Sequence, residues 1–294
     1  MDFKAYQVQA LQTDQVPGGL DDDSATAMMV PMLGLAGETG QLLKEYKKHL
    51  RDGPAHRLFK ERVAEELGDL LWYVSNVASK FGLDLDDIAA GNLAKVQARW
   101  SERAAAAPAL DADLPAQERL PRRMTIRLTE ESCGDRPKVR MTVNGDAIGE
   151  PLGDNAYDPD GYRFHDVFHL AYAAILGWSP NLRAFLKRKR KSLPLLDEVE
   201  DGGRARIIEE GVSALAFDYA RVHSFLDGIS EIDYGLLKTI RSMTSHLEVG
   251  QASAADWERA ILDGFAVWRD VMAHGGGEIL VDLDARQIRF LGPA

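Results

Sequence analysis

Acidic side chains recur at helical spacing on two neighbouring segments near the start of the chain. On the first segment, Glu38, Gln41 and Glu45 share one stripe, because offsets of three, four and seven residues return to the same helical face. On the second, the same rule aligns Glu66 with Asp69. If the two helices pack antiparallel, as their short connection predicts, these oxygen ligands converge and suit Mg²⁺ or Mn²⁺.

A divalent ion bound by these carboxylates would indicate a reaction at a phosphate group. It supplies what phosphoanhydride hydrolysis requires, namely neutralised phosphate charge and an oriented water nucleophile. A third segment carries Asn92, Lys95 and Arg99 at offsets of three and seven, an amide and two cations suited to phosphate oxygens. Each pattern alone is also typical of a solvated helix face, so the prediction depends on their order and spacing.

Four helices are expected to position these groups. The predicted spans are residues 6–13, 26–50, 56–80 and 84–102. Asp52-Gly53-Pro54 separates the second from the third, and Gly82 ends the third before Asp84 caps the fourth. The first part of the chain is therefore predicted to be a bundle of helices.

Three runs of this bundle carry a family resemblance: Gly37–Lys44, Glu65–Tyr73 and Asn92–Arg99. In this order they strongly resemble the MazG-like, all-α nucleoside triphosphate pyrophosphohydrolases. The opening Tyr6-Gln7 also looks like that family, and the resemblance covers roughly residues 3–103. It implies hydrolysis of a nucleoside or deoxynucleoside triphosphate to the monophosphate and pyrophosphate, for control of the nucleotide pool, by a homodimer or a dimer of dimers.

The resemblance also implies roles for single residues. The family pattern is Glu-x-x-Glu followed by Glu-x-x-Asp, which assigns Glu38, Glu66 and Asp69 as catalytic ligands of Mg²⁺, or of Mn²⁺ in its place. Gln41 stands where the family has a second carboxylate, so it offers the metal or the substrate a neutral carbonyl oxygen. Glu45, or Glu65 beside Glu66, is expected to compensate.

The resemblance also implies contacts between the substrate and further residues. Lys95 and Arg99 are expected to bind its phosphates, with Asn92 as a polar support. Trp72, or Tyr73 beside it, is expected either to stack on the base or to pack in the bundle core. A competing hypothesis is a nucleotide-sensing module, for example in phage defence, whose second domain acts as the effector.

Beyond the bundle, the sequence predicts a linker and a second domain. Residues 104–122 are rich in alanine, proline and acids, as in a linker, which places the two domains at 1–103 and 123–294. Alternating patterns at both ends of the second domain predict strands at residues 124–129, 138–143, 278–283 and 287–290, with helical patterns between them. The fold class is thus a multidomain chain: a MazG-like all-α bundle and then an α+β, mostly helical domain, with both of its ends in one sheet.

The second domain has a candidate metal site of its own. His165 and His169 are four residues apart, which lets two imidazoles on a helix reach one ion, and the pair Glu209-Glu210 on a later helix, Glu209 first, could complete the set. This centre could hold zinc, iron or manganese and be the catalytic one. The alternative is that both histidines are hydrogen-bonded beside an apolar stripe.

The composition limits the remaining functions. The net charge of -11 argues against a general surface for nucleic acid, and Lys187–Lys191 is the one strong basic run. The single cysteine excludes an intramolecular disulfide, and no segment approaches the length of a membrane helix. A cytoplasmic protein without a membrane partner is expected.

Overall fold

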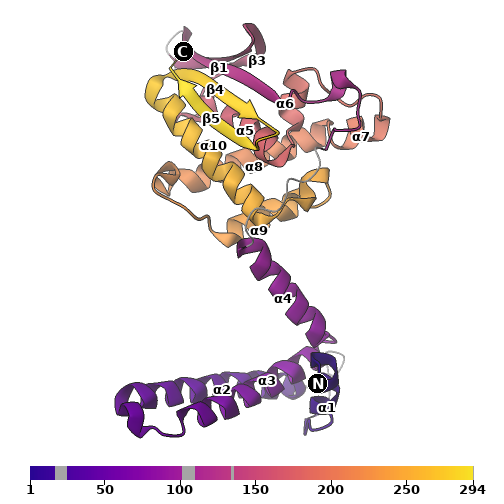
Figure 1. The fold of residues 1–294 in the computed structure, drawn as a ribbon, viewed down its shortest axis with the longest axis vertical. Coiled ribbons are helices and arrows are strands. Elements are labelled where there is room, and N and C mark those ends of the chain that lie inside the picture. Colours follow the sequence, from indigo (N-terminus) through magenta and orange to yellow (C-terminus); the bar gives the residue numbers. More distant parts are fainter. Residues whose placement is uncertain (17–24, 101–109, 134–135, 294) are drawn as a thin grey trace. The chain divides into compact units, whose positions relative to one another are not determined.

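The computed structural model describes residues 1–16, 25–100, 110–133 and 136–293, and these form two compact units. The first unit spans Met1–Gln97 and the second Ala98–Ala294. The first contains helices and the second combines helices with a sheet, which confirms the predicted order of an all-α and an α+β part (Figure 1). In the described part of the chain, no helix has the length and apolarity needed to cross a bilayer.

The first unit contains the four predicted helices. They are α1 (Phe3–Leu11), α2 (Ala25–Asp52), α3 (Phe59–Lys80) and α4 (Leu85–Trp100). The helices α2 and α3 lie side by side, and α1 packs on α3 (Figure 1). The predicted break at Asp52-Gly53-Pro54 is a short 3₁₀ turn, Gly53–Ala55, in which Gly53 adopts a positive φ of 53°.

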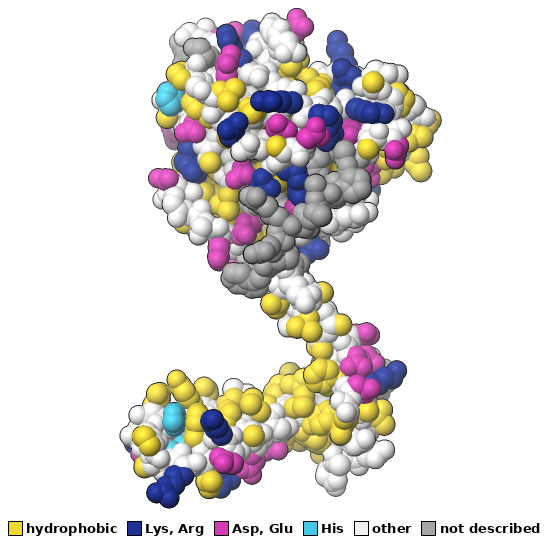
Figure 2. Space-filling view, in the orientation of Figure 1, with side chains coloured by type: hydrophobic (Ala, Val, Ile, Leu, Met, Phe, Trp, Pro, Cys, Tyr) yellow, Lys and Arg dark blue, Asp and Glu magenta, His cyan; other side chains and the backbone are white. Residues whose placement is uncertain are grey.

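Little apolar surface is buried within this unit. Among its described residues, the buried hydrophobic side chains are Ala10, Ala27, Ala78 and Leu85. Figure 2 shows hydrophobic side chains at the surface of this unit. On α2, larger hydrophobic side chains are exposed, and Met29, Leu33, Leu43 and Leu50 follow helical spacing along one face. An exposed apolar stripe of this length is typical of a surface that another protein surface covers.

The second unit contains one antiparallel sheet of five strands in the order β3-β2-β1-β4-β5. The strands are β1 (Arg123–Cys133), β2 (Arg136–Val143), β3 (Asp146–Leu152), β4 (Gly276–Asp282) and β5 (Gln287–Gly292). Because β1 pairs with β4, the two ends of the unit share one sheet, as predicted. The edge strand β3 was not predicted, since Gly149 and Pro151 interrupt its alternation and none of its residues is buried.

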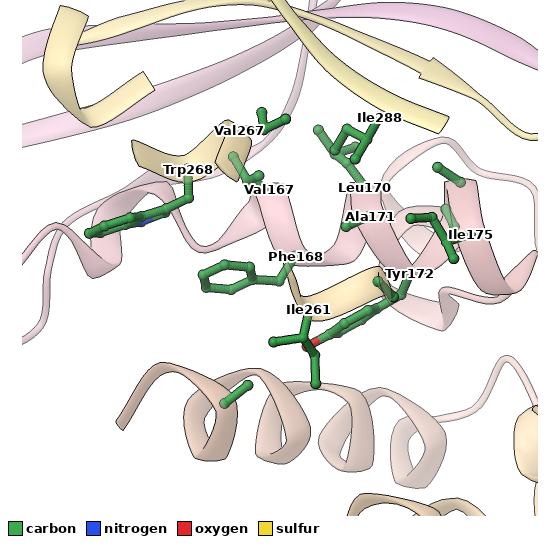
Figure 3. Packing of buried hydrophobic residues seen from close by; sticks show 14 of the residues in the cluster. Val167, Phe168, Leu170, Ala171, Tyr172, Ile175, Ile261, Val267, Trp268 and Ile288 are labelled. Atoms are coloured by element: carbon green, nitrogen blue, oxygen red, sulfur yellow. The ribbon is translucent and has the colours of Figure 1, made fainter. Parts of the chain in front are cut away.

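The helix α5 (Asp166–Leu176) forms the centre of this unit. All but one of its residues are buried, and it packs on α10 (Ala254–His274), on strands β4 and β5, and on α8 (Gly203–Arg221). Figure 3 shows Phe168 and Tyr172 of α5 beside Ile261 of α10, while Leu170 faces Ile288 of β5. The shorter helices are α6 (Pro180–Phe185), α7 (Pro194–Val199) and α9 (Tyr234–Thr244), of which α7 was not predicted.

The stretch predicted as a linker is packed where the structure describes it. Residues 101–109 lie outside the described part, but Asp111, Glu118 and Leu120 are all buried in the second unit. Asp111 accepts hydrogen bonds from the backbone N–H of Leu120 at 2.8 Å and from Arg183 at 2.7 Å. From Leu110 onward this stretch therefore belongs to the second unit, because its acids have buried partners that composition does not reveal.

The basic run Lys187–Lys191 is largely engaged within the protein. Arg190 is fully buried between the carboxylates of Asp201 and Glu248, at 2.8 Å and 2.7 Å. Lys189 lies 3.3 Å from Asp197, and Arg188 donates to the backbone carbonyl of Ala116. These partners leave little of the run for a nucleic acid.

Asp256 connects the start of α10 to the turn between β4 and β5, which leads to a prediction. It forms a capping box with Ser253 and an ion pair with Arg286. Burial would raise the pKa of Asp256, but Ser253 and Arg286 lower it below its usual value. Asp256→Ala should therefore lower the unfolding free energy of the second unit by about 1–2 kcal/mol near neutral pH.

The pH dependence follows from the direction of this shift. The stabilisation is complete above the ordinary carboxyl pKa, and it is lost as pH falls through the lower native pKa, so the difference between variant and wild type should shrink below about pH 4. Urea unfolding at pH 7 and pH 3 measures it. Asp263→Ala, which removes a partly exposed acid of the same helix that pairs with Arg259, is the control. A difference that stays constant over this range would contradict the prediction.

Candidate functional site

The carboxylates predicted to bind metal come together in the first unit. Glu38 of α2 and Glu66 and Asp69 of α3 each offer an oxygen, and these three atoms lie within 4.8 Å of one another. Glu38 and Glu66 are half-buried, whereas Asp69 is exposed, so the group has one side open to solvent. Three oxygens at this separation match the ligands of a hard divalent cation.

Electrostatic strain in this group also fits a cation. Partial burial raises the pKa of Glu66, and the neighbouring carboxylates, Glu38 first among them, raise it further. Burial and the charge of Asp69 likewise raise the pKa of the Tyr6 hydroxyl. A divalent ion would relieve this repulsion, since it favours the ionised form of every ligand.

A glycine allows the two helices that carry the acids to approach closely. A Cβ atom at Gly34 of α2 would lie 2.1 Å from the ring of Tyr73 on α3. Gly34 precedes Glu38 by four residues and therefore lies on the same face of α2. The Gly34–Tyr73 contact thus sets the spacing at which Glu38 faces Glu66.

The two acids expected to compensate for Gln41 have other partners. Glu45 is buried and binds Lys48 and the imidazole of His56, the latter at 3.0 Å. Glu65 pairs with Arg62 at 2.7 Å on the exposed side of α3. Gln41 is exposed, and its carbonyl oxygen accepts from Lys44 at 3.1 Å. Of the residues predicted to bind this metal, the structure therefore brings together Glu38, Glu66 and Asp69.

The residues predicted to contact the substrate differ in burial and in hydrogen bonding. Trp72 is half-buried, donates its indole N–H to Thr13 at 2.8 Å and packs edge-on against Tyr73, which favours the packing interpretation. Asn92 is exposed on α4 and forms no hydrogen bond to the acids within the described residues. The side chains of Lys95 and Arg99 lie outside the described part, although α4 includes both positions.

A second group of possible ligands lies at the first turn of α5. His165, Asp166 and His169 each offer an atom within 4.8 Å of the others, and all three residues are buried. His165 is preceded by a 3₁₀ turn, Tyr162–Phe164, and its ring stacks on Tyr162 with centroids 4.4 Å apart. The predicted pair of histidines is thus joined by Asp166, which sequence reasoning did not select.

Glu209 has a different position from the one expected of a ligand. It is fully buried, and its carboxylate accepts from the Ser179 hydroxyl at 2.6 Å and the Asn181 N–H at 2.8 Å. It also lies 2.9 Å from Nδ1 of His169. With these three partners, Glu209 holds the imidazole in place from behind.

The adjacent Glu210 faces the histidines instead. Its carboxylate oxygens lie 3.2 Å from Nε2 of His169 and 3.6 Å from Nε2 of His165. Both acids of this pair were candidates from the sequence, because periodicity does not tell which of two adjacent acids faces a given neighbour. The burial of Asp166 raises its pKa, and burial lowers the pKa of His165. Burial would also lower the pKa of His169, but the charges of Glu209 and Glu210 raise it well above its usual value.

Comparisons with known proteins assign both units to described families. Residues 30–103 match the model of the MazG nucleotide pyrophosphohydrolase domain, and residues 105–294 match that of the MazG C-terminal domain. The Gene 37 protein of Mycobacterium phage L5 is 35% identical over 101 residues, which are 34% of this chain and 89% of the phage protein. No solved structure matches the chain.

Proposed function

This chain belongs to the MazG family, with a nucleotide pyrophosphohydrolase domain followed by a MazG C-terminal domain, and on this basis we propose its reaction. The first unit hydrolyses a nucleoside or deoxynucleoside triphosphate to the monophosphate and pyrophosphate with Mg²⁺ or Mn²⁺. The observation that carries the proposal is the convergence of Glu38, Glu66 and Asp69. The role is control of the nucleotide pool in the cytoplasm, where such substrates occur.

The three acids have related roles in this proposal. Glu38 and Glu66 hold the ion from two facing helices, and Asp69 binds it from the solvent side, where the triphosphate enters. A divalent ion held there neutralises phosphate charge and makes water a stronger nucleophile near neutral pH. A carboxylate that accepts the water proton must lie within hydrogen-bond reach of that water.

Cations on α4 would bind the phosphates. Lys95 and Arg99 lie four residues apart, so they share one face of this helix, and Asn92 precedes Lys95 by three residues on that face. Guanidinium and ammonium groups bind phosphate oxygens by charge-assisted hydrogen bonds. We propose that they hold the two terminal phosphates, which leave as pyrophosphate.

An assay for pyrophosphate tests the proposed reaction. The full chain is incubated with each NTP and dNTP in the presence of Mg²⁺ or Mn²⁺, and released pyrophosphate and monophosphate are measured. Equimolar release that requires the metal is the expected result. Release of inorganic phosphate and a diphosphate would contradict cleavage between the α- and β-phosphates. Tight triphosphate binding without turnover would favour the nucleotide-sensing module, for which the similarity to a phage protein offers a context.

Position 41 gives a prediction about the strength of the metal site. Gln41→Glu adds a carboxylate one turn from Glu38 on α2. It should lower the Mg²⁺ concentration for half-maximal activity about fivefold, because an added charge near a surface site is worth ~1 kcal/mol. Thr39→Glu, which adds the same charge on an exposed position of the same helix, is the control. Equal effects of both variants would show that only net charge matters.

The apolar stripe of α2 predicts self-association. Met29, Leu33, Leu43 and Leu50 are exposed in the single chain, and few large apolar side chains are buried in the described part of this unit. We propose that a second copy covers the stripe in a homodimer or a dimer of dimers. Leu33→Asp with Leu43→Asp should shift the mass measured by light scattering to that of one chain, because buried charges oppose association. Leu195→Asp, at an exposed leucine of α7, should leave the mass unchanged.

A further inference from the structure

In each of the two histidines at the start of α5, the ring atom Nδ1 has a hydrogen-bond partner. Nδ1 of His165 lies 2.9 Å from the backbone carbonyl of Tyr162, and Nδ1 of His169 lies 2.9 Å from the carboxylate of Glu209. Since a carbonyl and a carboxylate can only accept, each Nδ1 carries a proton and donates it. A metal ion that displaces the proton from Nε2 can then bind the lone pair of Nε2. Metal-binding histidines are typically held in this way by a carbonyl or carboxylate behind the ring.

The two Nε2 atoms point toward one carboxylate. Glu210 lies 3.2 Å from Nε2 of His169 and 3.6 Å from Nε2 of His165, on the side opposite the Nδ1 anchors. The shorter contact does not have the alignment of a hydrogen bond, so Nε2 of His169 is buried without a hydrogen-bond partner. Oδ1 of Asp166 is likewise buried and has no hydrogen-bond partner. Such groups are costly unless another ligand satisfies them.

We propose that His165, Asp166, His169 and Glu210 bind a divalent first-row transition ion, with Zn²⁺ or Fe²⁺ as the chemical type. The ligand atoms are the two Nε2 atoms and one oxygen from each carboxylate. Two imidazoles favour such an ion over Mg²⁺, which binds oxygen ligands in octahedral geometry. Glu209 is a positioning residue, because it acts through Nδ1 of His169 and its own oxygens already have three partners.

Three of the four proposed ligands are buried, and the fourth, Glu210, is partly exposed. The side chains of His165 and His169 are 8% and 1% exposed, whereas that of Glu210 is 42% exposed. An ion can therefore enter beside Glu210 and take its carboxylate as the last protein ligand. The site is independent of the triphosphate reaction proposed for the first unit, since its residues all come from the second.

Metal binding by the full chain tests this inference. A triple variant, Glu38→Gln, Glu66→Gln and Asp69→Asn, first removes the acids of the other site. After chelator treatment it is titrated with Zn²⁺, Mn²⁺ or Mg²⁺ alone by calorimetry, and bound metal is counted by elemental analysis. We expect one equivalent of Zn²⁺, bound more tightly than Mg²⁺. No uptake of Zn²⁺ or Mn²⁺ above that of a non-binding protein would overturn the proposal.

Further substitutions in the triple variant then distinguish the residues that bind the ion from those that only position them. His165→Gln and Glu210→Gln should each weaken Zn²⁺ binding about 100-fold or more, and Glu209→Gln about 10–100-fold, as for other residues that orient a ligand. Asp218→Asn, at an exposed acid of the same helix α8, should change nothing. Circular dichroism and thermal unfolding check that each variant folds. Unchanged affinity in a folded His165→Gln and a folded Glu210→Gln would overturn the assignment.

A spectroscopic measurement on the triple variant does not depend on the folding of further variants. X-ray absorption of bound Zn²⁺ should show two imidazole nitrogens at about 2.0–2.1 Å. A spectrum with oxygen neighbours only would place the ion elsewhere and contradict the proposal.

Discussion

Replacing Glu66 by Gln should lower the rate of pyrophosphate release by about 1,000-fold, the largest change in activity expected for this chain. Glu66 offers an oxygen within 4.8 Å of those of Glu38 and Asp69, and burial together with the charges of these acids raises its pKa. The amide keeps the shape of the side chain but removes one of the charges that hold the ion. Charge stabilisation by a bound metal is worth several kcal/mol, and each 1.4 kcal/mol is a factor of ten in rate.

The adjacent residue provides the matched control. Glu65→Gln makes the same chemical change one position earlier, on an exposed side chain that pairs with Arg62. It should change the rate less than about threefold, because an exposed ion pair contributes little. Initial rates are measured over a range of Mg²⁺ concentrations. Equal losses in the two variants would show that the acids act only through the overall charge of α3.

Replacing Asp201 by Ala should destabilise the second unit by about 3–5 kcal/mol, the largest expected change in stability. Asp201 is fully buried and accepts from the backbone N–H of Arg190 at 2.7 Å and from its guanidinium at 2.8 Å. It also lies 3.8 Å from Arg183, whose pKa is lowered by burial and by the charge of Arg190. Removing the shared carboxylate leaves the two guanidinium groups buried with one negative charge fewer beside them. A buried charge that has lost its partner is strongly destabilising.

A surface pair gives the comparison for this effect. Asp218→Ala breaks the ion pair of Asp218 with Arg221, in which both side chains are more than half exposed. It should cost less than about 1 kcal/mol. Denaturant unfolding followed by the fluorescence of Trp178 and Trp257, both buried in the second unit, measures the two variants. Similar losses would mean that the buried network is not what stabilises this region.

The positions of the proposed metal-binding acids could be predicted from the sequence because they depend on local geometry. Glu66 and Asp69 must share a face of any helix that contains both, and a short connection places Glu38 opposite them. Alternating residues likewise predicted β1, β2, β4 and β5 near their observed bounds. Helix and strand periodicity are properties of the chain itself, so they can be read before the fold is known.

The partners of charged residues were not accessible in the same way. Glu45 has the right spacing for the metal stripe, but Lys48 and His56 bind it. Asp111 and Glu118 look like linker acids, but Arg183 and Ser192 bind them in the second unit. Spacing gives the direction of a side chain from its helix and leaves open which groups from other segments compete for it.

The acid pair Glu209-Glu210 shows most clearly what the sequence determined and what the fold decided. The sequence alone gave a helix with two adjacent acids and, earlier in the chain, two histidines at a spacing that suits one ion. Adjacent residues on a helix differ in direction by about 100°. Only the packing of α5 on α8 decided that Glu209 lies behind His169, saturated by Ser179 and Asn181, while Glu210 faces both Nε2 atoms. The physical reason is that hydrogen-bond partners are set by neighbours distant in sequence, whereas residue spacing is set by the helix.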